Sequence, residues 1–201
     1  MNKVKVQDKL KAFRIPIIGV IILFGVWFLF FRSSGITTQE FEEKLKNLSN
    51  GKVMITQSGV APVDSMDKSE GKIGMYIANW NGFMISTRVE NNNKIEDKAF
   101  FIMSKQVNLM DEIAIGQYRE LIQYVTRIAN PKLSVDEVNH IVDNDLNFNN
   151  QIMTGGNNTT SKDGMVYELK GGGEAGVFTF VVSTEKQLEE TNKLNKSNNQ
   201  N

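Results

Sequence analysis

An uninterrupted apolar run near the start of the chain constrains the fold more than any other feature. From Ile15 to Phe31 the sequence IPIIGVIILFGVWFLFF contains no charged or strongly polar residue. A helix built from these residues is apolar on every side, so it needs lipid or a deep protein core around it. At roughly 1.5 Å per residue it is about 25 Å long, near the lower limit for crossing a hydrocarbon layer of about 30 Å. The run therefore predicts a transmembrane helix over residues 15–31, with the lipid bilayer as its partner.

The charges beside this run predict its orientation. Residues 1–14 contain five Lys or Arg residues and a single acid, Asp8. Because the cytoplasmic flanks of membrane helices carry an excess of Lys and Arg, we expect this basic tail in the cytoplasm. Arg14 and Arg32 can extend their charged groups to the two headgroup regions while their aliphatic stems stay in the apolar layer. The sequence therefore predicts a single-pass protein of the cell membrane whose C-terminal part is extracytoplasmic.

A cleaved signal peptide is the alternative interpretation of the same segment. The small residues Ser33, Ser34 and Gly35 are acceptable to a signal peptidase, and cleavage after them would release a secreted domain. However, the apolar run is longer than a usual signal core, and it ends in bulky residues directly before Arg32. This ending is typical of an uncleaved signal-anchor, which is the interpretation that we prefer.

The rest of the chain has room for one globular domain. Its 201 residues accommodate a domain of about 150 residues besides the membrane segment and the tails. Cysteine is absent, which excludes disulfides and cysteine-bound metals. From Arg32 onward, 18 basic residues stand against 22 acidic residues, a net charge of −4. A mildly acidic domain without a basic stripe is not suited to a polyanion, so we do not expect nucleic-acid binding.

Asn81-Gly82 is the clearest local structural signal in this domain. An Asn-Gly pair accommodates the two positive φ angles of a type I′ turn, so the residues on either side are expected to form a β-hairpin. A two-residue turn also sets the register of the two strands. The expected core face contains the facing pairs Trp80 and Phe83, Ala78 and Ile85, Tyr76 and Thr87, and Gly74 and Val89.

The opposite face of this hairpin carries a candidate interaction patch. Ser86 and Glu90 suit a face in contact with water, but Met75 and Ile77 lie beside Arg88 on the same face. An apolar patch on a water-facing surface often marks a binding site. We therefore expect Met75, Ile77 and Arg88 to contact a partner, unless a helix or loop of the domain covers them.

The other expected elements complete an α+β pattern. Thr37 with Glu40, and Ser134 with Glu137, have the spacing of capping boxes that open two helices. A longer helix is expected from residue 111 to residue 129, where Asn130-Pro131 ends it. Further strands are expected over residues 52–57, 95–104, 165–169 and 177–183, with polar loops from residue 58 through Asp67 and over residues 147–164.

This order of elements predicts an α+β fold, in which an N-terminal single transmembrane helix precedes one small domain of antiparallel sheet with helices packed on one face. The polar C-terminal end is unsuited to packing and is expected to be disordered. The predicted segments are a cytoplasmic basic tail (1–14), the transmembrane helix (15–31), a linker (32–38), the extracytoplasmic domain (39–184) and the disordered tail (185–201).

His140 is the only histidine, and it makes the strongest available case for a metal site. On a helix, Asp136 and Asp143 lie four residues before it and three residues after it, so the three side chains share one face. A catalytic zinc site usually requires more than one nitrogen ligand. Asp136, His140 and Asp143 are therefore weak metal candidates, and the alternative is a solvated helix face.

No residue pattern in the sequence indicates a nucleophile or a cofactor. One histidine without a GxSxG motif gives no support for a hydrolytic triad. We therefore expect a non-catalytic, membrane-anchored binding domain with a protein or cell-wall partner, such as a subunit of a cell-envelope assembly. The Asn-rich and Lys-rich composition suggests a bacterial source. The alternatives are the secreted domain and a cell-wall or lipid enzyme that uses Asp136, Glu137 and Asp143.

Overall fold

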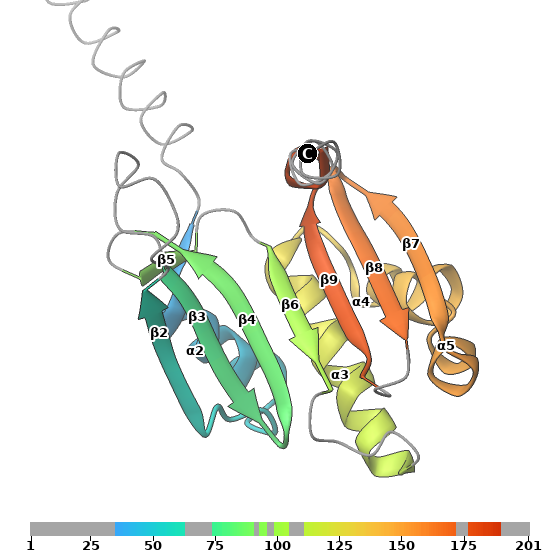
Figure 1. The fold of residues 1–201 in the computed structure, drawn as a ribbon, viewed down its shortest axis with the longest axis horizontal. Helices are drawn as coiled ribbons and strands as arrows, with labels where there is room; N and C mark the ends of the chain where they lie inside the picture. The colour runs from blue at the N-terminus through green and yellow to red at the C-terminus, as the bar shows by residue number, and fades with distance from the viewer. Residues whose placement is uncertain are drawn as a thin grey trace, which may run out of the picture. The chain divides into compact units, whose positions relative to one another are not determined.

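The computed structural model describes residues 35–62, 74–90, 93–95, 99–104, 111–171 and 177–189 (Figure 1). The chain divides into two compact units, Met1–Ser34 and Gly35–Asn201, and all of the described residues belong to the second. The expected cytoplasmic tail and transmembrane helix lie outside the described residues. Within the described ranges, no helix combines the length and the apolar character needed to cross a membrane.

The described part of the domain is built on one antiparallel sheet of seven strands in the order β2-β3-β4-β6-β9-β8-β7. Two short strands, β1 (Ile36–Thr37) and β5 (Lys94–Ile95), pair separately at one end of it. The α+β class with an antiparallel sheet is therefore confirmed. The seven strands are β2 (Gln57–Pro62), β3 (Gly74–Trp80), β4 (Phe83–Val89), β6 (Phe100–Met103), β7 (Gly156–Lys162), β8 (Met165–Gly171) and β9 (Thr179–Thr184).

The expected hairpin is confirmed in β3 and β4. Asn81 and Gly82 have φ angles of 48° and 85°, as a type I′ turn requires. Each of the four expected cross-strand pairs, from Trp80–Phe83 to Gly74–Val89, is present in the register.

The helices lie behind one face of the sheet, as Figure 1 shows. Both expected capping boxes are confirmed. The side chains of Thr37 and Ser134 each accept a hydrogen bond from the backbone N–H of the glutamate three residues later, and their own backbone N–H groups donate to the carboxylate of that glutamate. The long helix begins after Asp111, which caps it, and ends at Ala129 before Asn130. The helical segments are α2 (Thr38–Leu48), α3 (Glu112–Ala129), α4 (Val135–His140), the π-helix η3 (Ile141–Asp145) and α5 (Phe148–Thr154).

The core lies between this helical layer and the sheet. One row of side chains crosses five neighbouring strands on the helix-facing side, and each member is fully buried. Aromatic stacking joins the two layers, since Phe41 of α2 lies 4.9 Å from Phe100 and Tyr118 of α3 lies 5.3 Å from Phe83 between ring centroids. The buried row consists of Ala78, Ile85, Ile102, Phe180 and Leu169.

Two of the expected strands are misplaced. The strand expected over residues 52–57 is absent except for its last residue, Gln57, where β2 begins, and the rest of β2 lies in the stretch expected to be a loop. The Val53 N–H donates to the Ser49 hydroxyl at 2.9 Å, so it takes no part in a strand ladder. The single strand expected over residues 95–104 is two separate strands, of which β5 pairs with β1 and β6 joins the main sheet.

The expectation of a loop over residues 147–164 is wrong, because this segment forms α5 and β7. Asn147 precedes α5 with a positive φ of 49° and makes no side-chain capping bond, so α5 begins without the capping interaction that an N-cap asparagine usually provides. β7 has the sequence GNNTTSK and lacks the apolar alternation of a half-buried strand. It is held by polar contacts instead.

The structure also differs at two expected domain boundaries. The linker expected over residues 32–38 contains β1 and the first residue of α2. Residues 185–189, expected to be disordered, are helical. Thr184 opens this turn, because its N–H donates to Gln187 Oε1 at 2.9 Å and the Gln187 N–H donates to its hydroxyl at 3.3 Å. Residues 190–201 lie outside the described part.

Two isoleucines of α3 test the assignment of its buried face. Ile122 is fully buried, whereas Ile113 is 71% exposed. Ile122→Ala removes buried methyl groups and leaves a cavity, so we expect a loss of about 2–5 kcal/mol in the free energy of unfolding. Ile113→Ala should change it by less than about 0.5 kcal/mol. Urea denaturation of the full-length protein, followed by near-ultraviolet circular dichroism, measures both, and equal losses would contradict this orientation of α3.

Candidate interaction surface

The second face of the sheet has no described helix over it (Figure 1). Along each strand, the residues between the buried ones point to this open face. Six of them, on the four adjacent strands β3, β4, β6 and β9, are apolar. We call this set the open-face patch: Met75, Ile77, Met84, Phe101, Met103 and Val181.

Exposure is greatest at the centre of the patch. Phe101 lies on β6, which has three strands on either side in the sheet order, and its side chain is 43% exposed. Phe100, the preceding residue, points to the helices and is 1% exposed. Ile77 is 36% exposed, and the other four members are partly buried by their neighbours. An exposed phenylalanine at the middle of a sheet is unusual, because aromatic burial is strongly favourable.

Three of the six side chains in the patch are methionines. Methionine is unbranched and polarisable, so a surface rich in methionine can adapt its shape to the surface that covers it. Met75, Met84 and Met103 come from three adjacent strands, and Met84 lies directly opposite Met103 in the register. The patch is therefore apolar and deformable.

The charged residues beside the patch are paired with one another. Arg88 Nη2 lies 3.2 Å from Glu90 Oε1 at one flank, and Lys170 Nζ lies 2.8 Å from Glu168 Oε2 at the other. Each pair is neutral, so these flanks supply no excess of positive charge for an anionic bilayer surface or a polyanion. The open-face patch is better suited to a neutral protein surface.

Met75, Ile77 and Arg88, the residues expected to form an interaction patch, all lie on this open face. Their role in binding stays a prediction. Sequence reasoning missed Met84, Phe101, Met103 and Val181, because three of them lie on strands whose positions beside the hairpin depend on non-local pairing. Phe100–Met103 is apolar at every position, so the sequence contains no alternation that separates its buried residues from its exposed ones.

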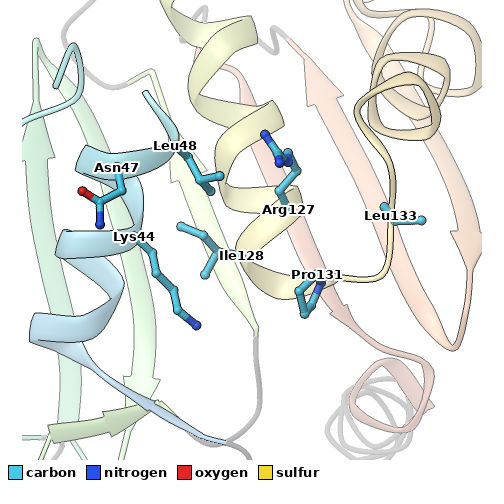
Figure 2. Close-up of a pocket in the computed structure, with 7 residues that line it drawn as sticks. All are labelled: Lys44, Asn47, Leu48, Arg127, Ile128, Pro131 and Leu133. Atoms are coloured by element: carbon cyan, nitrogen blue, oxygen red, sulfur yellow. The ribbon is translucent and has the colours of Figure 1, made fainter. Parts of the chain in front are cut away.

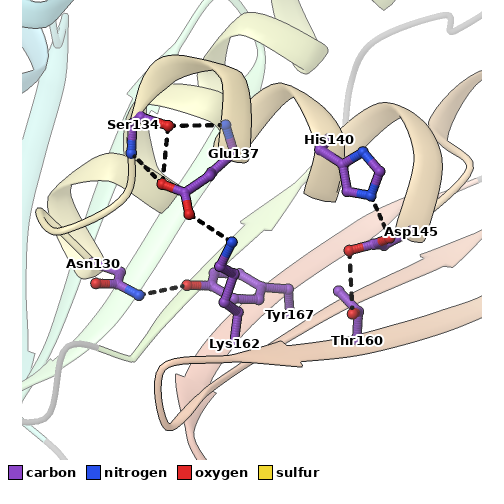
Figure 3. A network of polar contacts seen from close by, with 8 residues as sticks. All are labelled: Asn130, Ser134, Glu137, His140, Asp145, Thr160, Lys162 and Tyr167. Carbon is purple, nitrogen blue, oxygen red and sulfur yellow. Dashed lines mark hydrogen bonds and ion pairs between the residues drawn. The ribbon is translucent and has the colours of Figure 1, made fainter.

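The helical side of the domain carries a polar network that attaches β7 to the helices (Figure 3). The three helix-facing side chains of β7 each contact the α4 and η3 region. Lys162 Nζ donates to Glu137 Oε1 at 2.7 Å, Thr160 donates to Asp145 at 3.4 Å, and Asn158 donates to the Leu146 carbonyl at 3.0 Å. This network explains how a strand without apolar residues remains in the sheet.

The weak metal candidates are engaged in other contacts. Asp143 accepts from the guanidinium of Arg119, with Arg119 Nε at 2.7 Å from its Oδ1. His140 Nε2 lies 3.4 Å from Asp145, and Asp136 is exposed in the first turn of α4. Over the described ranges, no three His, Asp or Glu side chains are grouped so as to hold a metal ion. Glu137 is likewise bound to Ser134 and Lys162.

A pocket of about 300 Å³ opens between the C-terminal ends of α2 and α3 (Figure 2). Apolar side chains cover much of its wall, and Lys44 and Arg127 add two cations. Figure 2 shows their charged groups pointing in opposite directions rather than at a common point. Arg127 is in the last turn of α3, where the helix dipole favours a cation without a ligand. The lining residues are Lys44, Asn47, Leu48, Arg127, Ile128, Pro131 and Leu133.

Comparison with known proteins identifies no relative of this chain. No protein-family profile matches the chain, and neither the curated proteins nor the solved structures contain a significant match.

Glu137 gives the polar network a measurable pH dependence. Hydrogen bonds from Lys162 and from Ser134 lower the pKa of Glu137 from its ordinary value of 4.5 to about 2. A lowered pKa in the folded state means that the ionised carboxylate stabilises the fold above pH 4.5, and that this stabilisation is lost as the pH falls toward 2. Glu137→Gln should therefore weaken the dependence of unfolding free energy on pH within this range.

Lys162→Gln removes the main hydrogen-bond donor to Glu137 and should weaken the same dependence. Acid titration of both variants against the parent protein, monitored by circular dichroism, provides the measurement. If the acid-unfolding profile of Glu137→Gln matches that of the parent protein, the Glu137 carboxylate does not contribute to the pH dependence of the unfolding free energy.

Proposed function

We propose that this protein is a membrane-anchored, non-catalytic interaction domain that presents its open-face patch to a protein partner outside the cytoplasm. The observation that carries the proposal is the exposure of Phe101 and Ile77 in one cross-strand row of the open face, while the helix-facing residues of the same strands are buried. Apolar surface of this kind contributes about 25 cal/mol per Å² when a partner removes it from water.

The dimensions of the patch fit the centre of a protein interface. Four strands at a spacing of about 4.8 Å extend over about 14 Å, and three alternate residues along a strand extend over a similar distance. A standard interface buries about 800 Å² on each partner, with an apolar centre and a polar rim. The paired charges on β4 and β8 lie where such a rim would be.

The membrane anchor is proposed from the sequence of residues 15–31 and from the basic tail before it. Attachment to a bilayer confines the domain and its partner to the same surface. This confinement raises their effective concentration, so an interface of modest affinity is sufficient. These properties suit a subunit of a cell-envelope assembly.

A non-catalytic role is supported by the contacts of two of the three carboxylates proposed for an enzyme, whereas the third, Asp136, is exposed. Glu137 is held by a capping bond and by Lys162, and Asp143 is held by Arg119. A general acid or base needs a carboxyl group that is available to a substrate proton. Neither of these two residues has such a group in the described arrangement.

Photo-crosslinking in intact cells tests this proposal. A photoreactive phenylalanine analogue placed at Phe101 should capture a protein in the membrane fraction, because the open-face patch is then against a partner. The same analogue at Met153, which is 84% exposed on α5 of the helical layer, is the matched control and should capture none.

Equal capture at the two positions, or none at either, would contradict a specific role for the open face. Recovery of the protein in the culture medium, with Ile36 as its first residue, would support the secreted alternative and overturn the proposed anchor.

A further inference from the structure

The open face has an internal symmetry about the boundary between β4 and β6. One cross-strand row consists of Ile77, Ser86, Phe101 and Val181, and the next consists of Asn79, Met84, Met103 and Thr179. Each row has two members on either side of this boundary. In the first row the outer residues, Ile77 and Val181, are both β-branched and apolar. At the centre of this row the small Ser86 lies beside the large Phe101. In the second row the outer residues are both polar and the central residues are both methionine.

We infer that the partner of the open face is a second copy of this chain, stacked face to face about a twofold axis that runs parallel to the strands between β4 and β6. This inference rests on the proposed function, since it names the partner of the same surface. The axis places Ile77 over the partner's Val181 and Met84 over the partner's Met103. It also places Phe101 over the partner's Ser86, so that a large side chain meets a small one on both sides of the axis.

The parallel axis places neither charge of β8 over a like charge. Next to Val181 in the first row lies Glu168, which the parallel axis places over the partner's Gly59. Lys170 similarly lies over the partner's Gln57. A twofold axis along the first row, perpendicular to the strands, would instead place Glu168 over the partner's Glu168, and like charges in contact are unfavourable.

Stacked sheets cross at about −30° because each sheet is twisted. The pairs near the axis, Met84 with the partner's Met103 and Phe101 with the partner's Ser86, are therefore matched most closely. The outer pairs, such as Ile77 with the partner's Val181, are displaced by the crossing. The spacing between the two sheets is about 10 Å.

The direction of the axis is also compatible with two anchors in one bilayer. β1 lies at the end of the sheet where β4 ends, because it pairs with β5, and Lys94 of β5 bridges to Glu90 directly after β4 (Figure 1). An axis parallel to the strands leaves β1 of both copies at the same end of the dimer. A perpendicular axis would place them at opposite ends.

The absence of cysteine allows a direct test with the full-length protein in detergent micelles. Ile77→Cys and Val181→Cys are prepared separately, mixed, and treated with a bismaleimide that spans about 10 Å, the spacing of stacked sheets. We expect a band at twice the mass of one chain from the mixture. Neither variant alone should give this band, because each is offset from its own copy by three strands, about 14 Å, in addition to the sheet spacing.

Two further variants separate dimerisation from unspecific cross-linking. Mixing Met153→Cys with Val181→Cys places one thiol on the helical side and should give no product. Adding Phe101→Lys to both cross-linking variants should abolish the band, because it places two cations in the apolar interface. Near-ultraviolet circular dichroism of Phe101→Lys should match the parent spectrum, since Phe101 is outside the core.

Efficient cross-linking of Ile77→Cys with itself, or an unlinked mixture with the chain sedimenting as a monomer at all concentrations, would overturn the inference. If the chain is monomeric while the photoreactive analogue at Phe101 captures a different protein in cells, the proposed function stands and the second copy is excluded. If the chain is monomeric and the photoreactive analogue at Phe101 captures nothing, both the proposed function and the inferred dimer are excluded.

Discussion

The structure depends on the confinement of α2, α3, α4, η3 and α5 to one face of the sheet. The buried row from Ala78 to Leu169 is a consequence, because these residues alternate with those of the open face along each strand. Phe100 and Phe101 show the effect most directly, since a shift of one residue decides between the core and the surface. Val166 of β8 also points to the open face and is only 7% exposed, but the six residues of the open-face patch are less buried and need another explanation.

Local chemistry made much of the fold predictable. The Asn-Gly turn determines the register of β3 and β4 through backbone geometry alone, and the two capping boxes act within one turn of a helix. α5 and β7 could not be predicted in this way. Their positions depend on contacts between segments distant in sequence, such as Lys162 with Glu137, and no apolar periodicity announces them.

The candidate surface was likewise predictable only where strand pairing is local. Met75, Ile77 and Arg88 could be assigned to one face because the hairpin register is local. The placement of Phe101 beside Ser86, and of Val181 beside Phe101, depends on the order of β4, β6 and β9 in the sheet. β6 is reached across a connection from β4, and β9 only after α3, α4, η3, α5, β7 and β8. Alternation within each strand therefore cannot reveal the neighbours of β6 and β9. The symmetry of the open face exists only in that assembled order.

Thiol labelling in intact cells tests most directly whether the open face is outside the cytoplasm and occupied there. Phe101→Cys and Met153→Cys are each treated with a membrane-impermeant maleimide before and after the membranes are dissolved and diluted in detergent. We predict rapid labelling of the Met153→Cys variant in intact cells, and labelling of the Phe101→Cys variant only after dilution separates it from its partner. Equal labelling of the two variants in intact cells would show a bare open face, and labelling of neither before lysis would place the domain inside the cell.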